Sequence, residues 1–225
     1  MQLRRLHMAR RFLIGLTATL GWIGLLIQFP LSIAHSRAQG MTLIGAVITY
    51  LSFFTILTNL LIAVALTASF WPKSRVGSFF SRPAVTSALT GYIATVGIVY
   101  SLLLRSLWNP EGLQKTADIL LHDAVPLMFV AIWFFIFEKA RLPWRSVLGW
   151  LLYPLGYFCF ALVRGATTGL YPYPFIDVGQ IGYSSALGNA AVMLAAFAFL
   201  CMTLVAIGRW TQRHSSDYKP RREIG

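Results

Sequence analysis

The stretch Thr42–Ser69, TLIGAVITYLSFFTILTNLLIAVALTAS, contains no charged residue and is longer than the roughly 20 residues that a helix needs to cross a bilayer. The rest of the chain has the same character, because 57% of its 225 residues are hydrophobic and only 12% are charged. An average soluble domain carries roughly 25% charged residues. The sequence therefore predicts an integral membrane protein, and its two cysteines, both in apolar runs, indicate nothing about redox compartment.

Apolar runs separated by short polar breaks predict six helices in an all-α, six-transmembrane-helix bundle that forms one domain over residues 1–225. The expected spans are residues 12–33, 42–69, 84–105, 119–138, 146–163 and 183–208. The first apolar run is longer than the roughly 7–15 residues of a signal-peptide core, so we interpret it as a retained span. Interrupted helices of the kind found in transporters are not evident.

Positive charges predict the orientation. With the N-terminus inside, four of the 19 Lys and Arg residues fall on outer segments and fifteen on inner ones. Because cytoplasmic loops carry the excess of Lys and Arg, both termini are expected to be cytoplasmic. The net charge of +12 then has an explanation that does not involve nucleic acid. The inner residues are Arg4, Arg5, Arg10, Arg11, Lys73, Arg75, Arg82, Lys139, Arg141, Arg145, Arg209, Arg213, Lys219, Arg221 and Arg222; the outer ones are Arg37, Arg105, Lys115 and Arg164.

Polar residues inside the second span form the first candidate site. Ser52, Thr55 and Asn59 have helical spacing and would share one face of a continuous helix, with Thr58 beside them. Hydrogen bonding between transmembrane helices explains such a stripe equally well, and taken alone it favours that structural role.

The fourth span contains His122, the one histidine of the sequence that falls within a predicted span. Asp118, four residues earlier, lies on the same helical face and could orient the imidazole, and Asp123 is its neighbour. Pro126 removes a backbone hydrogen bond to the His122 carbonyl and favours a bend. A packing or interfacial role for the histidine is the alternative.

The outer loop after the fifth span, RGATTGLYPYPFIDVGQIG, is dense in proline and aromatic residues. This composition predicts an ordered cap that contains Tyr171 and Tyr173, although an interfacial aromatic belt would have the same composition. Arg164 could pair there with Asp177, Asp118 or Asp123. His122 and Asp118 lack further embedded ligands that would complete a metal site, so neither a metal nor a cofactor is expected.

Three blocks of the chain, FFTILTNLLIAV, LHDAVPLMF and WLLYPLGYFCFALVRGATTGLYPYPFIDVG, resemble the androgen-induced/androgen-dependent integral-membrane family, most closely its bacterial six-span branch. Eukaryotic members of that family are threonine hydrolases that cleave fatty acid esters of hydroxy fatty acids. The resemblance implies that Thr55 is the nucleophile, because an aromatic pair precedes it, and that His122 is its partner. Thr58 lacks the preceding aromatic pair.

The resemblance thus implies hydrolysis of a membrane lipid ester in the outer half of a bacterial cytoplasmic (inner) membrane. Asp118 or Asp123 would orient His122, while Asn59 or Ser52 would position Thr55 or donate to the oxyanion. Because Thr55 is expected near mid-membrane and His122 near the outer interface, the second span must be shifted or tilted. The alternatives are a small channel, transporter or lipid-binding protein with the same residues lining a cavity, or a structural subunit. Few polar residues in the inner halves of the spans argue against transport.

Overall fold

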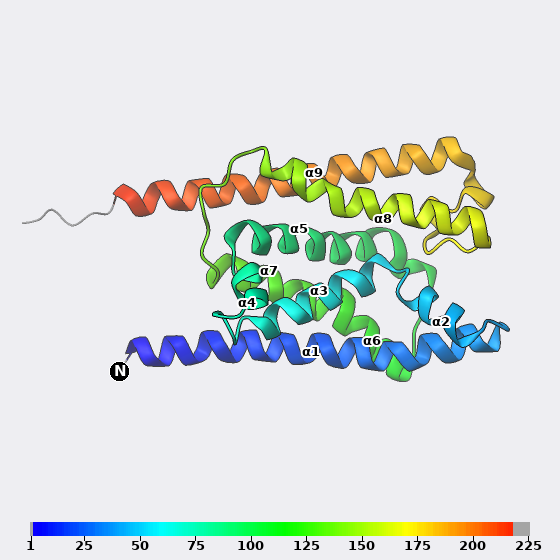
Figure 1. The fold of residues 1–225 in the computed structure, drawn as a ribbon, viewed down its shortest axis with the longest axis horizontal. Helices are drawn as coiled ribbons and strands as arrows, with labels where there is room; N and C mark the ends of the chain where they lie inside the picture. Colours follow the sequence, from blue (N-terminus) through cyan, green and yellow to red (C-terminus); the bar gives the residue numbers. More distant parts are fainter. Residues whose placement is uncertain (1, 218–225) are drawn as a thin grey trace, which may run out of the picture.

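A computed structural model describes residues 2–217 of the chain, and within that range every regular element is a helix. Figure 1 shows the helices arranged as an elongated bundle with their axes mostly along one direction. The α-helices are α1 (Gln2–Ala38), α2 (Leu43–Tyr50), α3 (Phe54–Ala68), α4 (Arg75–Phe80), α5 (Pro83–Val99), α6 (Gly112–Ile119), α7 (Val125–Phe135), α8 (Ser146–Thr168) and α9 (Val178–Asp217). Short π or 3-10 turns are η1 (Tyr100–Leu104), η2 (Arg105–Leu107), η3 (Leu120–Ala124) and η4 (Pro174–Ile176).

The apolar helices confirm an all-α architecture suited to a membrane. Five helical segments of the described chain are long and apolar enough to cross a bilayer, and a sixth results if the bent pair α2–α3 is one span. The helices extend beyond several predicted boundaries because they continue through polar residues that hydropathy does not mark as membrane. α1, for example, begins at Gln2 and ends at Ala38 rather than covering 12–33.

The prediction of a continuous second helix over 42–69 is wrong. α2 ends at Tyr50, α3 begins at Phe54, and the two axes meet at 74°. This interruption is not one of the paired Gly/Pro interruptions found in transporters, which the sequence did not show. No glycine or proline lies at the break, so the usual sequence signal for a helix end is missing there.

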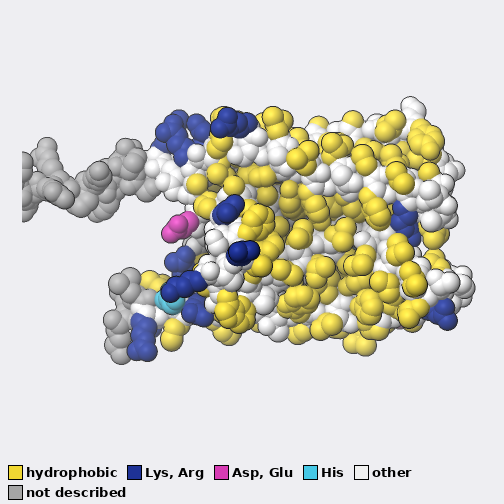
Figure 2. Space-filling model, viewed as in Figure 1, with side chains coloured by type: hydrophobic (Ala, Val, Ile, Leu, Met, Phe, Trp, Pro, Cys, Tyr) yellow, Lys and Arg dark blue, Asp and Glu magenta, His cyan; other side chains and the backbone are white. Residues whose placement is uncertain are grey.

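The beginning of α1 and the end of α9 lie at the same end of the bundle, whereas α2 and the connection from α8 to α9 lie at the other (Figure 1). Lys and Arg side chains gather at the first of these ends, and a broad hydrophobic surface covers the middle of the visible face (Figure 2). Lys219, Arg221 and Arg222 lie outside the described residues. We call the end with α2 and the α8–α9 connection the distal end.

Two buried apolar clusters form the core, and the smaller one includes Tyr50 of α2 and Leu121. Ile62 and Leu66 of α3, Ile93 of α5 and Phe129 of α7 belong to one cluster and have no exposed surface. Many large apolar side chains on the outside of the bundle are exposed, as expected for lipid-facing positions. The apolar cavity described below adjoins this core, because Val96 and Phe197 belong to both.

Candidate functional site

The break in the second span determines the position of Thr55. Phe53 has an extended conformation (φ −87°, ψ 129°), and Thr55 is the second residue of α3. The amides of the first turn of a helix have no partners within that helix, and they give its N-terminus a partial positive charge. Thr55 therefore lies in the first turn of a helix that starts inside the protein, rather than in the middle of a continuous helix.

Aromatic residues from α8 and the following loop hold the break in place. The Tyr157 hydroxyl donates to the Ser52 carbonyl at 2.8 Å, and the Tyr173 hydroxyl accepts from the Thr55 N–H at 3.4 Å. The Phe54 ring packs edge-on against Tyr157, with ring centroids 5.1 Å apart. These contacts satisfy backbone groups that the interruption frees, and they fix the direction in which α3 starts.

Tyr173 lies in the loop between α8 and α9. Burial raises the pKa of its hydroxyl above the ordinary value, and hydrogen bonds with the hydroxyl and backbone of Thr55 act in the opposite direction. The phenol therefore stays protonated at neutral pH and can donate a hydrogen bond next to Thr55.

His122 lies in a π-turn, η3, that joins α6 to α7. Pro126 follows one turn later and has no N–H for the His122 carbonyl, which accounts for the irregular turn at this point. Helix α5 approaches closely because residue 97 is glycine: a Cβ there would lie 3.3 Å from the His122 carbonyl oxygen. Single π-turns inside α-helices occur frequently at functional sites.

Asp118 and Tyr100 surround the His122 ring. The ring Nδ1 is 3.1 Å from the Asp118 backbone carbonyl, with hydrogen-bond geometry, and 3.0 Å from the carboxylate Oδ1. The Tyr100 hydroxyl donates to the other carboxylate oxygen at 2.5 Å, and the Tyr100 ring stacks on the imidazole with centroids 3.9 Å apart. Because Nδ1 faces Asp118, the other nitrogen, Nε2, is the one left to take a proton.

Asn59 links the two helices that carry Thr55 and His122. Its Nδ2 donates to the Thr55 carbonyl at 2.9 Å and to the Leu121 carbonyl at 3.0 Å. Asn59 has no exposed surface, and its Oδ1 has no hydrogen-bond partner. The side-chain amide thus ties the start of α3 to the residue before His122, which agrees with a positioning role and leaves its N–H donors unavailable to a ligand.

A cavity of about 750 Å³ lies in the distal half of the bundle. Its walls include Thr55, Asp118, His122, Arg164 and Tyr173, which come from four separate parts of the chain. The structure therefore brings the predicted threonine and histidine to one cavity. No hydrogen bond joins the Thr55 hydroxyl to the His122 ring in the described structure, as is common for catalytic pairs without a bound substrate.

A second, smaller cavity of about 90 Å³ is apolar and meets the first at Thr55, Tyr100, Leu104 and Tyr173. It runs between α5, α8 and α9, and its other walls are almost entirely apolar side chains such as Val96, Val99, Pro154, Phe158, Met193, Leu194 and Phe197. Thr55 thus lies where the larger cavity, which contains Asp118, His122 and Arg164, meets one whose walls carry few polar groups. We call them the polar cavity and the apolar cavity.

Several predicted site residues have other roles. The Thr58 hydroxyl is 3.3 Å from the Tyr153 hydroxyl, and Thr58 lines neither cavity. Ser52 lines the polar cavity, but it lies in the break instead of on the face of α3, and its hydroxyl donates to the Ile48 carbonyl at 2.6 Å. The proposed single face of Ser52, Thr55 and Asn59 is therefore wrong for Ser52.

Asp123 and Asp177, the other two aspartates predicted for the site, do not line the polar cavity. Asp123 pairs with Arg105, so Asp118 is the carboxylate beside the imidazole. Asp177 accepts hydrogen bonds from the Gly179 N–H at 3.0 Å and from the Gln180 side chain at 2.7 Å, contacts that fix the start of α9.

Arg164 and Tyr171 belong to the distal wall of the polar cavity. The Arg164 guanidinium donates to the Leu170 carbonyl at 2.6 Å and to the Thr49 hydroxyl at 2.9 Å. The predicted pairing of Arg164 with an aspartate is wrong, since none of its recorded contacts in residues 2–217 is with a carboxylate. Tyr171 packs directly on Gly165, where an added Cβ would lie 2.0 Å from the ring.

Sequence reasoning identified Tyr171 and Tyr173 but missed Tyr100, Tyr153 and Tyr157. Tyr153 and Tyr157 are four residues apart in the fifth predicted span, a spacing that puts both hydroxyls on one helical face and could have drawn attention to them. Tyr100 lies at the outer end of an apolar run, where an interfacial tyrosine is the ordinary interpretation. Among residues 2–217 no group of three His, Cys, Asp or Glu side chains could hold a metal ion.

The chain matches no known family model, no curated protein and no solved structure. The class supported directly by the fold is that of an integral membrane protein with a bundle of apolar helices.

Proposed function

We propose that this protein is an intramembrane hydrolase of lipid esters in which Thr55 is the nucleophile and His122 the general base. The observation that carries the proposal is the interrupted second span, which opens a helix N-terminus at Thr55 on the wall of the cavity that also contains His122. The resemblance to the androgen-induced/androgen-dependent family agrees with this assignment and suggests fatty acid esters of hydroxy fatty acids as substrates.

In the proposed reaction, Nε2 of His122 takes the proton of the Thr55 hydroxyl as its oxygen attacks the ester carbonyl. The Asp118 backbone carbonyl accepts from Nδ1, the carboxylate Oδ1 lies 3.0 Å from the same nitrogen and stabilises the imidazolium, and Tyr100 holds the carboxylate in place. The alcohol leaves with the proton from His122, which gives an acyl-threonine. A water molecule, deprotonated by His122, then attacks the acyl carbon, releases the fatty acid and restores the Thr55 hydroxyl.

The first turn of α3 supplies an oxyanion site. The Ile56 N–H has no helical partner and Ile56 lines the polar cavity, whereas the Thr55 N–H already donates to the Tyr173 hydroxyl. Backbone donors at a helix N-terminus stabilise the negative charge that develops on a tetrahedral intermediate. The Tyr173 hydroxyl, beside the Thr55 N–H, can add a further donor.

The two cavities suggest how an amphiphilic ester would be held. Its acyl part would enter the apolar cavity between α5, α8 and α9, and its polar part would remain in the polar cavity, so that the ester lies at Thr55, where the cavities meet. A passage through the membrane is less well supported, because the buried apolar cluster that contributes Val96 and Phe197 to the wall of the apolar cavity continues beyond it with Ile62, Leu66 and Phe129.

The proposed orientation has six spans and both termini in the cytoplasm of a bacterium, with the polar cavity in the outer half of the inner membrane. The gathering of Lys and Arg side chains at the end opposite the polar cavity supports it (Figure 2). A lipid substrate would then arrive by lateral diffusion in the outer leaflet.

Labelling with a fluorescent fluorophosphonate tests the proposal, because such a probe reacts with activated serine and threonine hydroxyls. The purified wild type and the Thr58→Ala variant should be labelled, whereas Thr55→Ala and His122→Ala should not. Thr58 is the matched control because its hydroxyl lies on the same helix and faces Tyr153 instead of a cavity. Labelling that persists in both Thr55→Ala and His122→Ala would remove this pair from the mechanism.

A further inference from the structure

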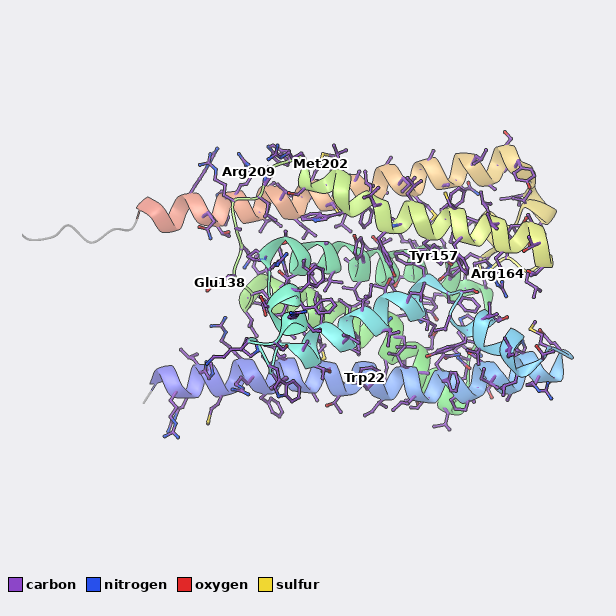
Figure 3. All side chains as sticks on the ribbon, viewed as in Figure 1. Trp22, Glu138, Tyr157, Arg164, Met202 and Arg209 are labelled. Carbon is purple, nitrogen blue, oxygen red and sulfur yellow. The ribbon has the colours of Figure 1, made fainter. Side chains whose placement is uncertain are left out.

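Arg164 is a buried cation that faces the polar cavity without a carboxylate partner. The residue is 9% exposed and lines the same cavity as Thr55 and His122. Figure 3 shows Arg164 and Tyr157 on α8, with Arg164 nearer the distal end. Transfer of a guanidinium out of water is costly unless an anion compensates its charge.

The acidic groups nearest in the fold are engaged elsewhere. The Asp118 carboxylate accepts from the Tyr100 hydroxyl, and its other oxygen, which has no hydrogen-bond partner, lies 3.0 Å from the imidazole Nδ1; Asp123 pairs with Arg105. Asp177 accepts from the first turn of α9. Neither of the ion pairs recorded among residues 2–217 contains Arg164, so its positive charge is not neutralised by these aspartates or by Glu111, the other acidic residue of the outer loops.

The guanidinium also retains unused donors. It has five N–H groups, and its recorded hydrogen bonds are those to the Leu170 carbonyl and the Thr49 hydroxyl. The Nε is fully buried with no hydrogen-bond partner in the described residues. Both recorded acceptors are neutral, so they orient the guanidinium group without cancelling its charge.

We propose that Arg164 is an anion-binding subsite, which holds the carboxylate or phosphate of an amphiphilic ligand in the polar cavity. A planar guanidinium binds such oxyanions through two parallel hydrogen bonds, and an ammonium group cannot reproduce that geometry. As a statement about substrate, the inference rests on the proposed function: the preferred ester carries an anionic group on the part that stays in the polar cavity. Arg164 is then a specificity-determining residue that lies apart from the reacting atoms.

The test compares three ligands with the same chain and different head groups: dodecanoate, dodecyl phosphate and 1-dodecanol. Their binding to the purified full-length protein in a nonionic detergent is measured by calorimetry. We expect at least one anionic ligand to bind roughly tenfold or more tightly than the alcohol, as a charge-assisted bidentate contact would give. Whichever of the two anions binds more tightly identifies the source of the head group.

The variants isolate the charge. Arg164→Gln should abolish the preference for the anion while leaving the affinity for dodecanol within about twofold. Arg37→Gln is the matched control, because Arg37 is an exposed arginine of the distal end that also donates to a backbone carbonyl, that of Met41. Arg37→Gln should keep the preference of the wild type.

Three results would overturn the subsite: no preference for either anion in the wild type, a preference that survives Arg164→Gln, or an equal loss for all three ligands in that variant. Gel filtration and thermal unfolding establish which variants fold. If Arg164→Gln does not fold, Arg164→Lys decides: a reduced preference supports bidentate binding, and an unchanged one contradicts it.

Because binding is measured without turnover, the subsite and the hydrolase can fail separately. If Arg164→Gln loses the anion preference but fluorophosphonate never labels the wild-type protein, the subsite is supported and the hydrolase proposal is refuted. Labelling at Thr55 without any anion preference would do the reverse.

Discussion

Replacing Asn59 with leucine removes the side-chain link between the helix of Thr55 and the turn of His122. The wild-type amide donates two hydrogen bonds, at 2.9 and 3.0 Å, to the Thr55 and Leu121 carbonyls. Leucine has a similar size and no donor, so the substitution loses both contacts without opening a large void.

These two hydrogen bonds set a range for the free energy of unfolding that Asn59→Leu should lose. A hydrogen bond between transmembrane segments contributes about 0.6 kcal/mol on average, and a buried one in general about 0.5–1.5 kcal/mol. Two such bonds give about 1–3 kcal/mol. Removing the unpartnered Oδ1 of Asn59 offsets part of this loss. We therefore expect Asn59→Leu to lower the free energy of unfolding by about 1–2 kcal/mol, which corresponds to roughly 2–8 °C in Tm.

Differential scanning fluorimetry of the protein in detergent measures this change, with Thr58→Val as the control. Thr58 is also fully buried, but its recorded side-chain hydrogen bond is with the Tyr153 hydroxyl, and Thr58 lines neither cavity. Asn59→Leu should in addition slow fluorophosphonate labelling, while Thr58→Val leaves the labelling rate unchanged. Equal shifts in Tm for the two variants, with labelling preserved in both, would refute the claim that Asn59 positions the pair.

Two further substitutions test the neighbourhood of the polar cavity. Tyr100→Phe removes the hydroxyl that donates to Asp118 while the ring can still stack on the imidazole. Labelling should slow roughly tenfold, and Tm should fall by several degrees because the buried carboxylate loses a hydrogen bond; an unchanged rate would show that the carboxylate needs no such support. Gly165→Ala places a methyl group 2.0 Å from the Tyr171 ring, so it should displace the ring and lower Tm by several degrees. Gly156→Ala on the same helix is the control, because its methyl group meets nothing within 4 Å and should leave Tm unchanged or slightly higher. Similar Tm values for the two variants would contradict the packing described for Tyr171.

The long apolar helices could be predicted from sequence because hydropathy responds to composition alone. Residues 84–105 and 146–163 were expected as spans, and α5 with its η1 and η2 turns and α8 cover them. The boundaries were less accurate since helices continue into polar flanks; α8, for instance, extends to Thr168. In α9, Gly182 permits a kink with φ 74°, a left-handed conformation that a glycine allows but does not by itself predict.

The break at residues 51–53 could not be predicted, because its causes are distant in sequence. Tyr157 on α8 binds the Ser52 carbonyl, and Tyr173 from the following loop meets the Thr55 N–H. Leu51, Ser52 and Phe53 carry no helix-breaking signal of their own. The break also removes the expected difficulty over depth, since α3 begins at Phe54 and brings Thr55 to the cavity of His122.

The candidate residues could be chosen from the sequence, because they are polar side chains in apolar spans and because of a family resemblance. Their contact partners could be identified only in the folded structure. The sequence favoured Asp118 and left Asp123 as an alternative partner of His122. The fold shows that Asp123 pairs with Arg105, while Asp118 lies beside the Tyr100 hydroxyl and the imidazole. The lone position of Arg164 could likewise not be anticipated, since three aspartates were available to it in sequence.

The most direct test of the central claim is to identify, by mass spectrometry, the residue that carries the fluorophosphonate adduct in the wild-type protein. The account predicts one adduct within Phe53–Asn59, located on Thr55, and its loss in His122→Ala, which lacks the base. An adduct on Thr58 or on a residue outside the polar cavity, or one on Thr55 that forms equally well in His122→Ala, would contradict it.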